Sequence, residues 1–413
     1  MGTVKNNKKN KKSKKKKWTK FRHKVATALL RIILSPYCRI KYGIKVDKFK
    51  GQEKRPYLVL LNHQTGFDQF FVGMAFKGPI YYLATEDIFS MGFVSSIIKY
   101  LVAPIPIKKQ TTDIRAIMNC MKVAKEGGTI AIAPEGNRTY SGKTVYMSPS
   151  IAPLARKFNI PIALYRIEGG YGVQPRWSDV VRKGKMRGYV SRVITPEEYK
   201  DMTDDELFAI IKDGLYVNEA TCDGLYKHKK SAEYLERAMY FCPTCGLSTF
   251  ESHNDIIECK KCGKKIKYLP TKELCGVEFD FSYRFVANWY EAQEDYINSL
   301  NILENTDNAL YKENVELYEV VPYKKKNLLC DRAILSLYGD RIEINASGNN
   351  TSYSFDDLST VTVLGKNKLN IYAGEHIYQI KGDKRFNALK YVNIYHRYKN
   401  IKAGEENVKF LGL

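Results

Sequence analysis

Apolar and polar residues follow three different patterns along the chain. Short apolar runs at 57–61 and 129–133, each followed by polar residues, are typical of buried strands in an α/β sheet. After about residue 325, apolar residues recur at every second position, which predicts antiparallel strands. These strands are expected at 333–338, 341–344, 351–355, 360–364, 368–372 and 376–380. A final helix is predicted from the three-residue spacing of Phe386, Leu389, Val392 and Tyr395.

Residues 19–36 predict an amphipathic helix that ends at Pro36. One face of that helix carries only apolar side chains, those of Phe21, Val25, Ala28, Leu29, Ile32 and Ile33. Arg31 interrupts the apolar run, which is too short to cross a bilayer. A helix lying in a membrane interface fits this pattern. A signal peptide fits less well, because no small-residue cleavage site precedes Pro36.

Positive charge is concentrated at the start of the chain. The 413 residues carry a formal net charge of +23, and residues 1–24 alone contain twelve Lys and Arg and no acidic residue. Residues 1–18 therefore read as a disordered polybasic tail. Together with the apolar helix, this tail favours an anionic membrane surface as partner. Nucleic acid is the second interpretation of such a basic arm and is disfavoured.

The segment Asn62-His63-Gln64-Thr65-Gly66-Phe67-Asp68 directly follows the first apolar run. On a straight helix His63 and Asp68 would lie about 140° apart around the axis and could not meet. They meet if the segment is a strand-to-helix turn with Gly66 at the bend. An imidazole oriented by a carboxylate is a general base for a hydroxyl group. No Ser or Cys stands in a nucleophile-elbow context, so the hydroxyl is expected to belong to the substrate.

A second polar segment, Pro134-Glu135-Gly136-Asn137-Arg138, follows the apolar run at 129–133. Ligands of α/β proteins bind at the carboxyl ends of buried strands, where both segments are expected. Arg138 offers a planar set of donors that suits a phosphate. Gly136 allows close approach of a ligand to the backbone. Glu135 is expected to accept a hydrogen bond from a substrate hydroxyl or to hold Arg138.

These two segments resemble signatures of the glycerolphosphate/lysophosphatidic acid acyltransferase family, over roughly residues 40 to 215. Residues 62–68 resemble its His-x4-Asp signature, and residues 134–138 resemble Pro-Glu-Gly-Thr-Arg with Asn137 in place of Thr. The apolar run 160–165 resembles a further block. Residues 105–109 resemble the block that normally ends in Asp-Arg, but here Lys108 and Lys109 end it. A Lys keeps the charge of that Arg and loses its bidentate geometry.

The resemblance implies an activity and a set of site residues. His63 and Asp68 would be catalytic, and the substrate would be bound by Glu135, Gly136, Asn137, Arg138, Lys108 and Lys109. The implied reaction moves a fatty acyl group from an acyl thioester, acyl-coenzyme A or acyl carrier protein, to lysophosphatidic acid, giving phosphatidic acid. The alternatives are another lysophospholipid acceptor, or a non-catalytic protein that binds lipid or nucleic acid. The expected location is peripheral, on the cytoplasmic face of a membrane.

Four of the nine cysteines have the spacing of a metal site. Two Cys-x2-Cys pairs are separated by thirteen residues, and a glycine follows each pair. Four thiolates presented by two tight turns predict a structural zinc ribbon, with a short hairpin between the pairs. The expected ligands are Cys242, Cys245, Cys259 and Cys262. A redox dithiol is the alternative for any single pair. The other five cysteines are assigned to the core or the surface.

The predicted fold class is α/β: a mixed-sheet acyltransferase domain with flanking helices, a zinc ribbon, and a small β-rich domain that resembles the pleckstrin-homology/GRAM superfold. Thr203 to Glu206 form a helix-start signal near the end of the first domain. The expected boundaries are 1–18 for the tail, 19–36 for the surface helix, 37–225 for the acyltransferase domain, 226–275 for the ribbon and linker, 276–324 for a linker with a helical segment, and 325–413 for the β-rich domain.

Overall fold

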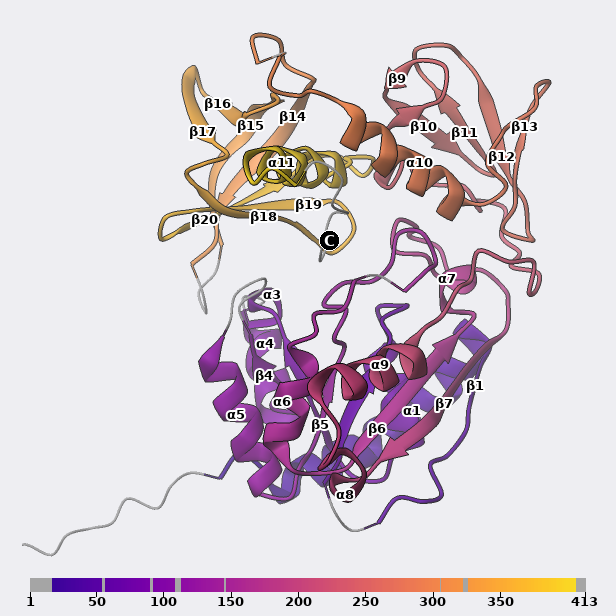
Figure 1. Cartoon of the computed structure of the whole chain (residues 1–413), viewed down its shortest axis with the longest axis vertical. Helices are drawn as coiled ribbons and strands as arrows, with labels where there is room; N and C mark the ends of the chain where they lie inside the picture. Colours follow the sequence, from indigo (N-terminus) through magenta and orange to yellow (C-terminus); the bar gives the residue numbers. More distant parts are fainter. Residues whose placement is uncertain are drawn as a thin grey trace, which may run out of the picture.

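The chain folds into two stacked halves, which Figure 1 shows in a computed structural model. The structure describes residues 17–53, 56–89, 92–107, 113–144, 146–304, 306–321 and 326–405. The lower half in the figure holds a mixed sheet with its helices, and the upper half holds the cysteine-rich hairpins and the C-terminal strands. The predicted fold class is thereby confirmed.

The lower half is built on a seven-stranded sheet, here called the N-terminal sheet, in the order β1-β7-β6-β2-β5-β3-β4. Only β6 and β7 pair antiparallel. The strands are β1 (Ile44–Val46), β2 (Leu58–Leu61), β3 (Ile80–Ala84), β4 (Ile105–Pro106), β5 (Thr129–Ile132), β6 (Ile162–Glu168) and β7 (Met186–Ile194). The helices are α1 (Phe21–Tyr42), α2 (Asp68–Ala75), α3 (Glu86–Phe89), α4 (Phe93–Leu101), α5 (Ile114–Lys125), α6 (Ile151–Phe158), α7 (Gly170–Val173), α8 (Pro196–Tyr199) and α9 (Asp204–Leu215).

The apolar run of β2 is continuous because helices cover both faces of the sheet. Leu58 and Leu60 belong to one buried cluster, which also contains residues of α5, α6 and α9. Val59 and Leu61 point the other way, into a cluster with residues of α1 and α2. Successive side chains of a strand alternate between its faces, so a strand at the centre of the sheet must be apolar at every position.

Helix α1 is longer than the sequence predicts. It passes through Pro36, where the sequence analysis ended it, and continues to Tyr42 before Gly43 closes it with φ +62°. Cys38 and Tyr42 are buried in the core, and this packing anchors the last turns despite the proline. Arg31 is partly buried against α2. It donates hydrogen bonds to the carbonyls of Gly73 and Phe76 at the end of α2.

The predicted apolar face of α1 is solvent-exposed, with Phe21, Leu29, Ile32 and Ile33 between 56% and 78% exposed. The neighbouring α4 adds four exposed apolar side chains, Phe93, Val94, Ile97 and Tyr100. The two helices are in contact, because Arg22 donates to the carbonyl of Tyr100 and stacks on its ring. We call the exposed apolar residues of α1 and α4 the apolar face. Among the described residues, no helix combines the length and the hydropathy that a membrane span requires.

The cysteine-rich region forms short antiparallel hairpins, here called the ribbon. Its sheet has the order β10-β11-β12-β13, and β8 pairs with β9. The elements of this region are η1 (Leu235–Arg237), β8 (Phe241–Cys242), β9 (Gly246–Leu247), β10 (Phe250–His253), β11 (Ile256–Cys259), β12 (Lys265–Tyr268), β13 (Leu274–Gly276) and α10 (Val286–Ser299). The hairpin predicted between the cysteine pairs is β10–β11.

The C-terminal sheet has seven antiparallel strands in the order β17-β16-β15-β14-β20-β19-β18. They curl around α11, as Figure 1 shows. The elements are β14 (Tyr311–Glu319), β15 (Asn327–Leu337), β16 (Arg341–Ala346), β17 (Asn349–Ser354), β18 (Leu358–Leu364), β19 (Lys368–Ala373), β20 (His376–Lys381) and α11 (Leu389–Lys402). The six predicted strands and the helix are present. One buried cluster spans this sheet and the ribbon.

The central strand β14 was missed, and it lies where the sequence analysis placed a linker. It joins β15 on one side to β20 on the other. Its inward face reads Tyr311, Glu313, Val315 and Leu317, and the glutamate breaks the apolar alternation. The structure explains this residue: Glu313 accepts hydrogen bonds from Tyr391 and Lys390 of α11. A polar residue on an inward face is tolerated when it is paired.

Candidate active site

Two polar segments leave the N-terminal sheet at the same edge. Strand β2 lies between β5 and β6 and runs parallel to both, with Leu60 opposite Ile132 and Leu164. Since neighbouring parallel strands end at one edge, residues 62–68 after β2 and 134–138 after β5 become spatial neighbours. The first of them, Asn62, is buried and binds the backbone of Ile167 through both side-chain atoms, at 2.8 and 2.7 Å. These two hydrogen bonds fix the end of β2 against β6.

The His63 imidazole and the Asp68 carboxylate are in contact. Nδ1 of His63 lies 2.7 Å from Oδ2 of Asp68. An ionised carboxylate only accepts hydrogen bonds, so Nδ1 carries the proton and Nε2 keeps its lone pair. The Asp68 side chain is almost fully buried, whereas that of His63 is 29% exposed. The ring can therefore be reached from solvent while its orienting partner is shielded.

Asp68 is held in place by the turn that precedes it. Its carboxylate accepts hydrogen bonds from the backbone N–H groups of Gln64 and Thr65, at 2.7 and 2.9 Å, and from the Thr65 hydroxyl at 2.7 Å. Asp68 is also the first residue of α2, where a negative charge is favourable. With His63 added, both carboxylate oxygens are fully engaged, which fixes the direction of the imidazole.

Gly66 is not required for this turn, contrary to the sequence-based expectation. It is not among the glycines with positive φ, and no atom lies within 4 Å of the position that a Cβ would occupy. Thr65 closes the turn instead: its hydroxyl donates to Asp68 and accepts from the Phe67 N–H at 3.0 Å. Side-chain hydrogen bonds of this kind shape turns without glycine.

Glu135 connects the two segments. Its buried carboxylate accepts a hydrogen bond from the backbone N–H of His63 at 2.9 Å. This contact was not expected from the sequence, and it ties the loop after β5 to the backbone of His63. Gly136 has φ +67°, a conformation that favours glycine. Asn137 is buried.

Arg138 follows Asn137 on the same loop, is half-buried, and forms no ion pair among the described residues. Burial and, next, the like charge of Arg176 lower the pKa of Arg138 to about 10, while the charge of Asp68 opposes the shift. Arg138 therefore remains a cation at neutral pH. A half-buried cation without a carboxylate partner suits an anionic ligand. Lys108 and Lys109, the other expected phosphate ligands, lie outside the described residues.

Arg176 was not identified from the sequence. It lies in a loop after α7, is 2% exposed, and donates a hydrogen bond to the backbone carbonyl of Arg138 at 3.0 Å. It also stacks on the Tyr140 ring, with the guanidinium carbon 4.2 Å from the ring centroid. Nothing in the local sequence Gln174-Pro175-Arg176-Trp177 marks it, because its partners come from distant segments.

The four predicted metal ligands converge in the ribbon. The sulfur atoms of Cys242, Cys245, Cys259 and Cys262 all lie within 4.8 Å of one another. Tetrahedral zinc with Zn–S bonds of about 2.3 Å places its sulfurs about 3.8 Å apart, and Cys242 and Cys262 are separated by 3.8 Å. Gly246 and Gly263, which follow the pairs, have φ of +70° and +73°. The donor set and its geometry fit zinc.

Comparisons with known proteins agree with the geometry at the edge of the N-terminal sheet. Residues 44–167 match the sequence model of the family described as Acyltransferase. The chain is 21% identical over 195 residues to the 1-acyl-sn-glycerol-3-phosphate acyltransferase of Bacillus subtilis (strain 168), covering 47% of this chain and 92% of that protein.

Two solved structures show weaker similarity. The 1-acyl-sn-glycerophosphate (LPA) acyltransferase PlsC from Thermotoga maritima matches with 18% identity and a TM-score of 0.40, over 46% of this chain and 77% of that one. The N-terminal PH domain of human ARAP2 matches with 11% identity and a TM-score of 0.19, over 22% of this chain and 81% of that one.

Proposed function

With an acyltransferase domain in residues 44–167 as the premise, we propose that the chain transfers a fatty acyl group from an acyl thioester to the free hydroxyl of 1-acylglycerol-3-phosphate, giving phosphatidic acid. The donor is acyl-coenzyme A or acyl carrier protein. The observation that carries this proposal is the 2.7 Å contact between His63 and the buried Asp68, with Nε2 of the ring left to accept a proton.

In the proposed reaction, His63 acts as the general base. Nε2 removes the proton of the acceptor hydroxyl as its oxygen attacks the thioester carbonyl. The tetrahedral intermediate then expels the thiolate, which takes the proton back from the imidazolium. The free thiol and the new ester are the products. Asp68 stabilises the transient imidazolium and keeps Nε2 directed at the hydroxyl.

Arg138 is the proposed binding residue for the acceptor phosphate. Its charge is retained at neutral pH, and its guanidinium has no carboxylate partner among the residues that the structure describes. The charge of Asp68 opposes the lowering of the Arg138 pKa, which supports one site for the proposed base and the proposed cation. Gly136 and Asn137 would shape the pocket between them, and Glu135 would hold the backbone of His63.

The proposal includes attachment to the anionic cytoplasmic face of a membrane. The apolar face on α1 and α4 supports it, since exposed apolar side chains on helices are suited to insertion between headgroups. The polybasic residues that precede α1 add attraction to anionic lipids. The lipid acceptor would enter from the same membrane. Zinc in the ribbon would be structural, because the four cysteines belong to a different half of the molecule from His63.

The test is release of free thiol from an acyl thioester in the presence of lysophosphatidic acid. We expect thiol release by the full chain, and a loss of about 10²–10⁴-fold in kcat for His63→Ala, the range that a positioned general base contributes. His376→Ala is the matched control, because this histidine is 61% exposed and pairs with Glu319 on the surface of the C-terminal sheet. Near-normal turnover by His63→Ala would refute the proposed base.

A further inference from the structure

The turn between β18 and β19 of the C-terminal sheet reaches the candidate active site. Arg176 makes the connection through three hydrogen bonds to backbone carbonyls. It donates to Gly365 on the turn at 3.2 Å, to Val363 near the end of β18 at 3.4 Å, and to Arg138 on the loop after β5 at 3.0 Å. A single buried guanidinium therefore holds this turn against the segment that carries the phosphate-binding cation.

Lys366, the next residue of the turn, brings another cation to this place. Its Nζ lies 2.8 Å from Oδ1 of Asp179, which Arg237 also binds at 2.8 and 3.1 Å. Although burial opposes the shift, hydrogen bonds from Arg237 and Lys366 lower the pKa of Asp179 to about 2. This carboxylate is thus shared by two cations and remains ionised.

Four cations, Arg138, Arg176, Arg237 and Lys366, come from the segments that meet here, and two of them bind the carboxylate of Asp179. Arg237 and Lys366 share Asp179, whereas neither Arg138 nor Arg176 has an ion pair with a carboxylate of the described residues. Burial lowers the pKa of Lys366; the hydrogen bond and charge of Asp179 oppose this shift, and the charges of Arg138 and Arg237 add to it. Buried cations in excess are costly unless an anion compensates them.

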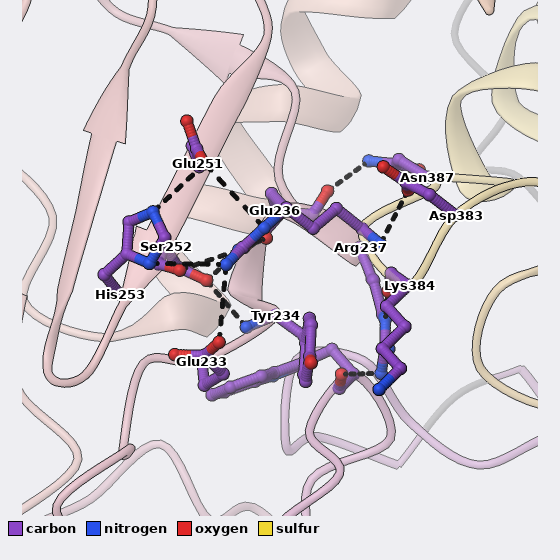
Figure 2. Close-up of polar contacts among 12 residues, drawn as sticks. Glu233, Tyr234, Glu236, Arg237, Glu251, Ser252, His253, Asp383, Lys384 and Asn387 are labelled. Atoms are coloured by element: carbon purple, nitrogen blue, oxygen red, sulfur yellow. Dashed lines mark hydrogen bonds and ion pairs between the residues drawn. The ribbon is translucent and has the colours of Figure 1, made fainter. Parts of the chain in front are cut away.

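A polar network, which Figure 2 shows, joins residues 233–237 and strand β10 to the segment that follows β20. Arg237 donates to the carbonyls of Lys384 and Trp177 at 2.7 and 3.0 Å, so it binds both halves of the molecule. Asn387 donates to the carbonyl of Glu236 at 2.8 Å, and Arg385 forms an ion pair with the side chain of Glu236. These hydrogen bonds and the ion pair hold the C-terminal sheet against residues 236 and 237, and they would be broken if the sheet moved away from that segment.

We propose that Lys366 is a binding residue for the phosphate group of the acyl acceptor, so that both halves of the chain build the headgroup site. This inference rests on the proposed function. Arg176 is a positioning residue in it, because its hydrogen bonds to backbone carbonyls join the turn to Arg138. When the acceptor binds, the Lys366 ammonium contacts the phosphate and Arg237 keeps Asp179 neutralised.

The test compares Lys366→Met, Lys366→Arg and the control Lys381→Met in the full chain. Lys381 lies on the same sheet but pairs with Glu316 at the surface. A lost charge-assisted contact is worth about a tenfold to hundredfold change in affinity. We expect Lys366→Met to raise the KM for lysophosphatidic acid by that factor, with kcat changed by less than about threefold. Lys366→Arg should restore most of the affinity, and Lys381→Met should change nothing.

Two further measurements identify which substrate carries the phosphate that Lys366 contacts. With monoacylglycerol, an acceptor without phosphate, Lys366→Met should behave like the native chain. With acyl-N-acetylcysteamine, a thioester without phosphates, the effect of Lys366→Met on the KM of lysophosphatidic acid should persist. An unchanged KM for lysophosphatidic acid, an equal loss with monoacylglycerol, or an effect that appears only with coenzyme A thioesters would overturn the inference.

A binding measurement keeps this inference separate from the proposed function. Calorimetric titration of glycerol 3-phosphate into the full chain needs no turnover. If the native chain releases no thiol but binds glycerol 3-phosphate, and Lys366→Met binds it about tenfold more weakly or worse, the proposed function fails and the site remains. If the native chain and Lys366→Met bind it equally, or neither binds it, Lys366 is not a phosphate ligand.

Discussion

Replacing Asp68 with Asn tests the geometry on which the proposed mechanism depends. The change keeps the size of the side chain and removes its charge. The new carboxamide must place its NH₂ group against either Nδ1 of His63 or the donors of Thr65, because all of these groups donate to the carboxylate in the native chain. If the NH₂ faces the ring, the imidazole must present Nδ1 as the acceptor, and Nε2 then carries the proton.

The expected loss follows from the contact distance. With Nδ1 and Oδ2 2.7 Å apart, the centres of charge of the imidazolium and the carboxylate are roughly 4 Å apart. At an effective dielectric constant of about 20 this attraction is worth about 4 kcal/mol. Since about 1.4 kcal/mol corresponds to a factor of ten in rate, kcat should fall by about 10³-fold. The buried donor left without an acceptor should also destabilise the fold by about 1–3 kcal/mol.

The assay is thiol release with lysophosphatidic acid at saturating thioester, at a temperature where thermal unfolding shows that the Asp68→Asn variant is folded. Asp205→Asn is the control, since Asp205 is exposed on the first turn of α9. The KM values should change little, because Asp68 contacts His63 and its own turn rather than the substrate. A kcat within about threefold of the native value, in a folded variant, would show that His63 does not need Asp68 and would refute the reasoning.

Three further predictions concern other parts of the molecule. Cys259→Ser should lose the zinc ion proposed for the four ribbon cysteines, measured by elemental analysis, while the exposed Cys275→Ser keeps it; equal zinc content in Cys259→Ser and the native chain would contradict the metal site. Ile32→Asp should weaken sedimentation with anionic vesicles, whereas Leu328→Asp, at an exposed apolar position of β15, should not; equal binding by both would argue against the apolar face. Burial raises the pKa of Glu219 from 4.5 to about 7. Between these two pH values the folded state binds more protons than the unfolded state. The free energy of unfolding should therefore fall as pH rises from about 5 to 8, by at most about 3 kcal/mol. Denaturant titrations should show that the free energy of unfolding depends less on pH in Glu219→Gln than in the native chain. An equal dependence on pH would contradict the assignment of this shift to Glu219.

The candidate site residues could be selected from the sequence because each stands at a position that local pattern defines. His63 and Arg138 follow short apolar runs, and such runs predict buried strands whose ends meet at one edge of a sheet. The cysteine ligands were predictable because metal coordination imposes a short spacing and a permissive residue after each pair. The capping box at Thr203 and Glu206 was equally local, and both of its hydrogen bonds are present.

The sequence was misleading where a tertiary contact replaced a local rule. Gly66 was expected to make the bend after β2, but hydrogen bonds between Thr65 and Asp68 make it. Pro36 was expected to end the first helix, but the burial of Tyr42 carries the helix onward. Strand β14 was missed because Glu313 has its partners on α11, which is distant in sequence.

By itself, then, the sequence determined the buried strands at 57–61 and 129–133, six of the seven C-terminal strands, the cluster of four cysteines, and the apolar face of the first helix. Only the tertiary structure decided that Glu135 holds the His63 backbone, that Arg176 joins the loop after β5 to the β18–β19 turn, and that Lys366 pairs with Asp179. The physical reason is the range of the forces involved. Hydrophobic periodicity and capping act within a few residues, whereas these polar contacts form only after packing has brought distant loops together.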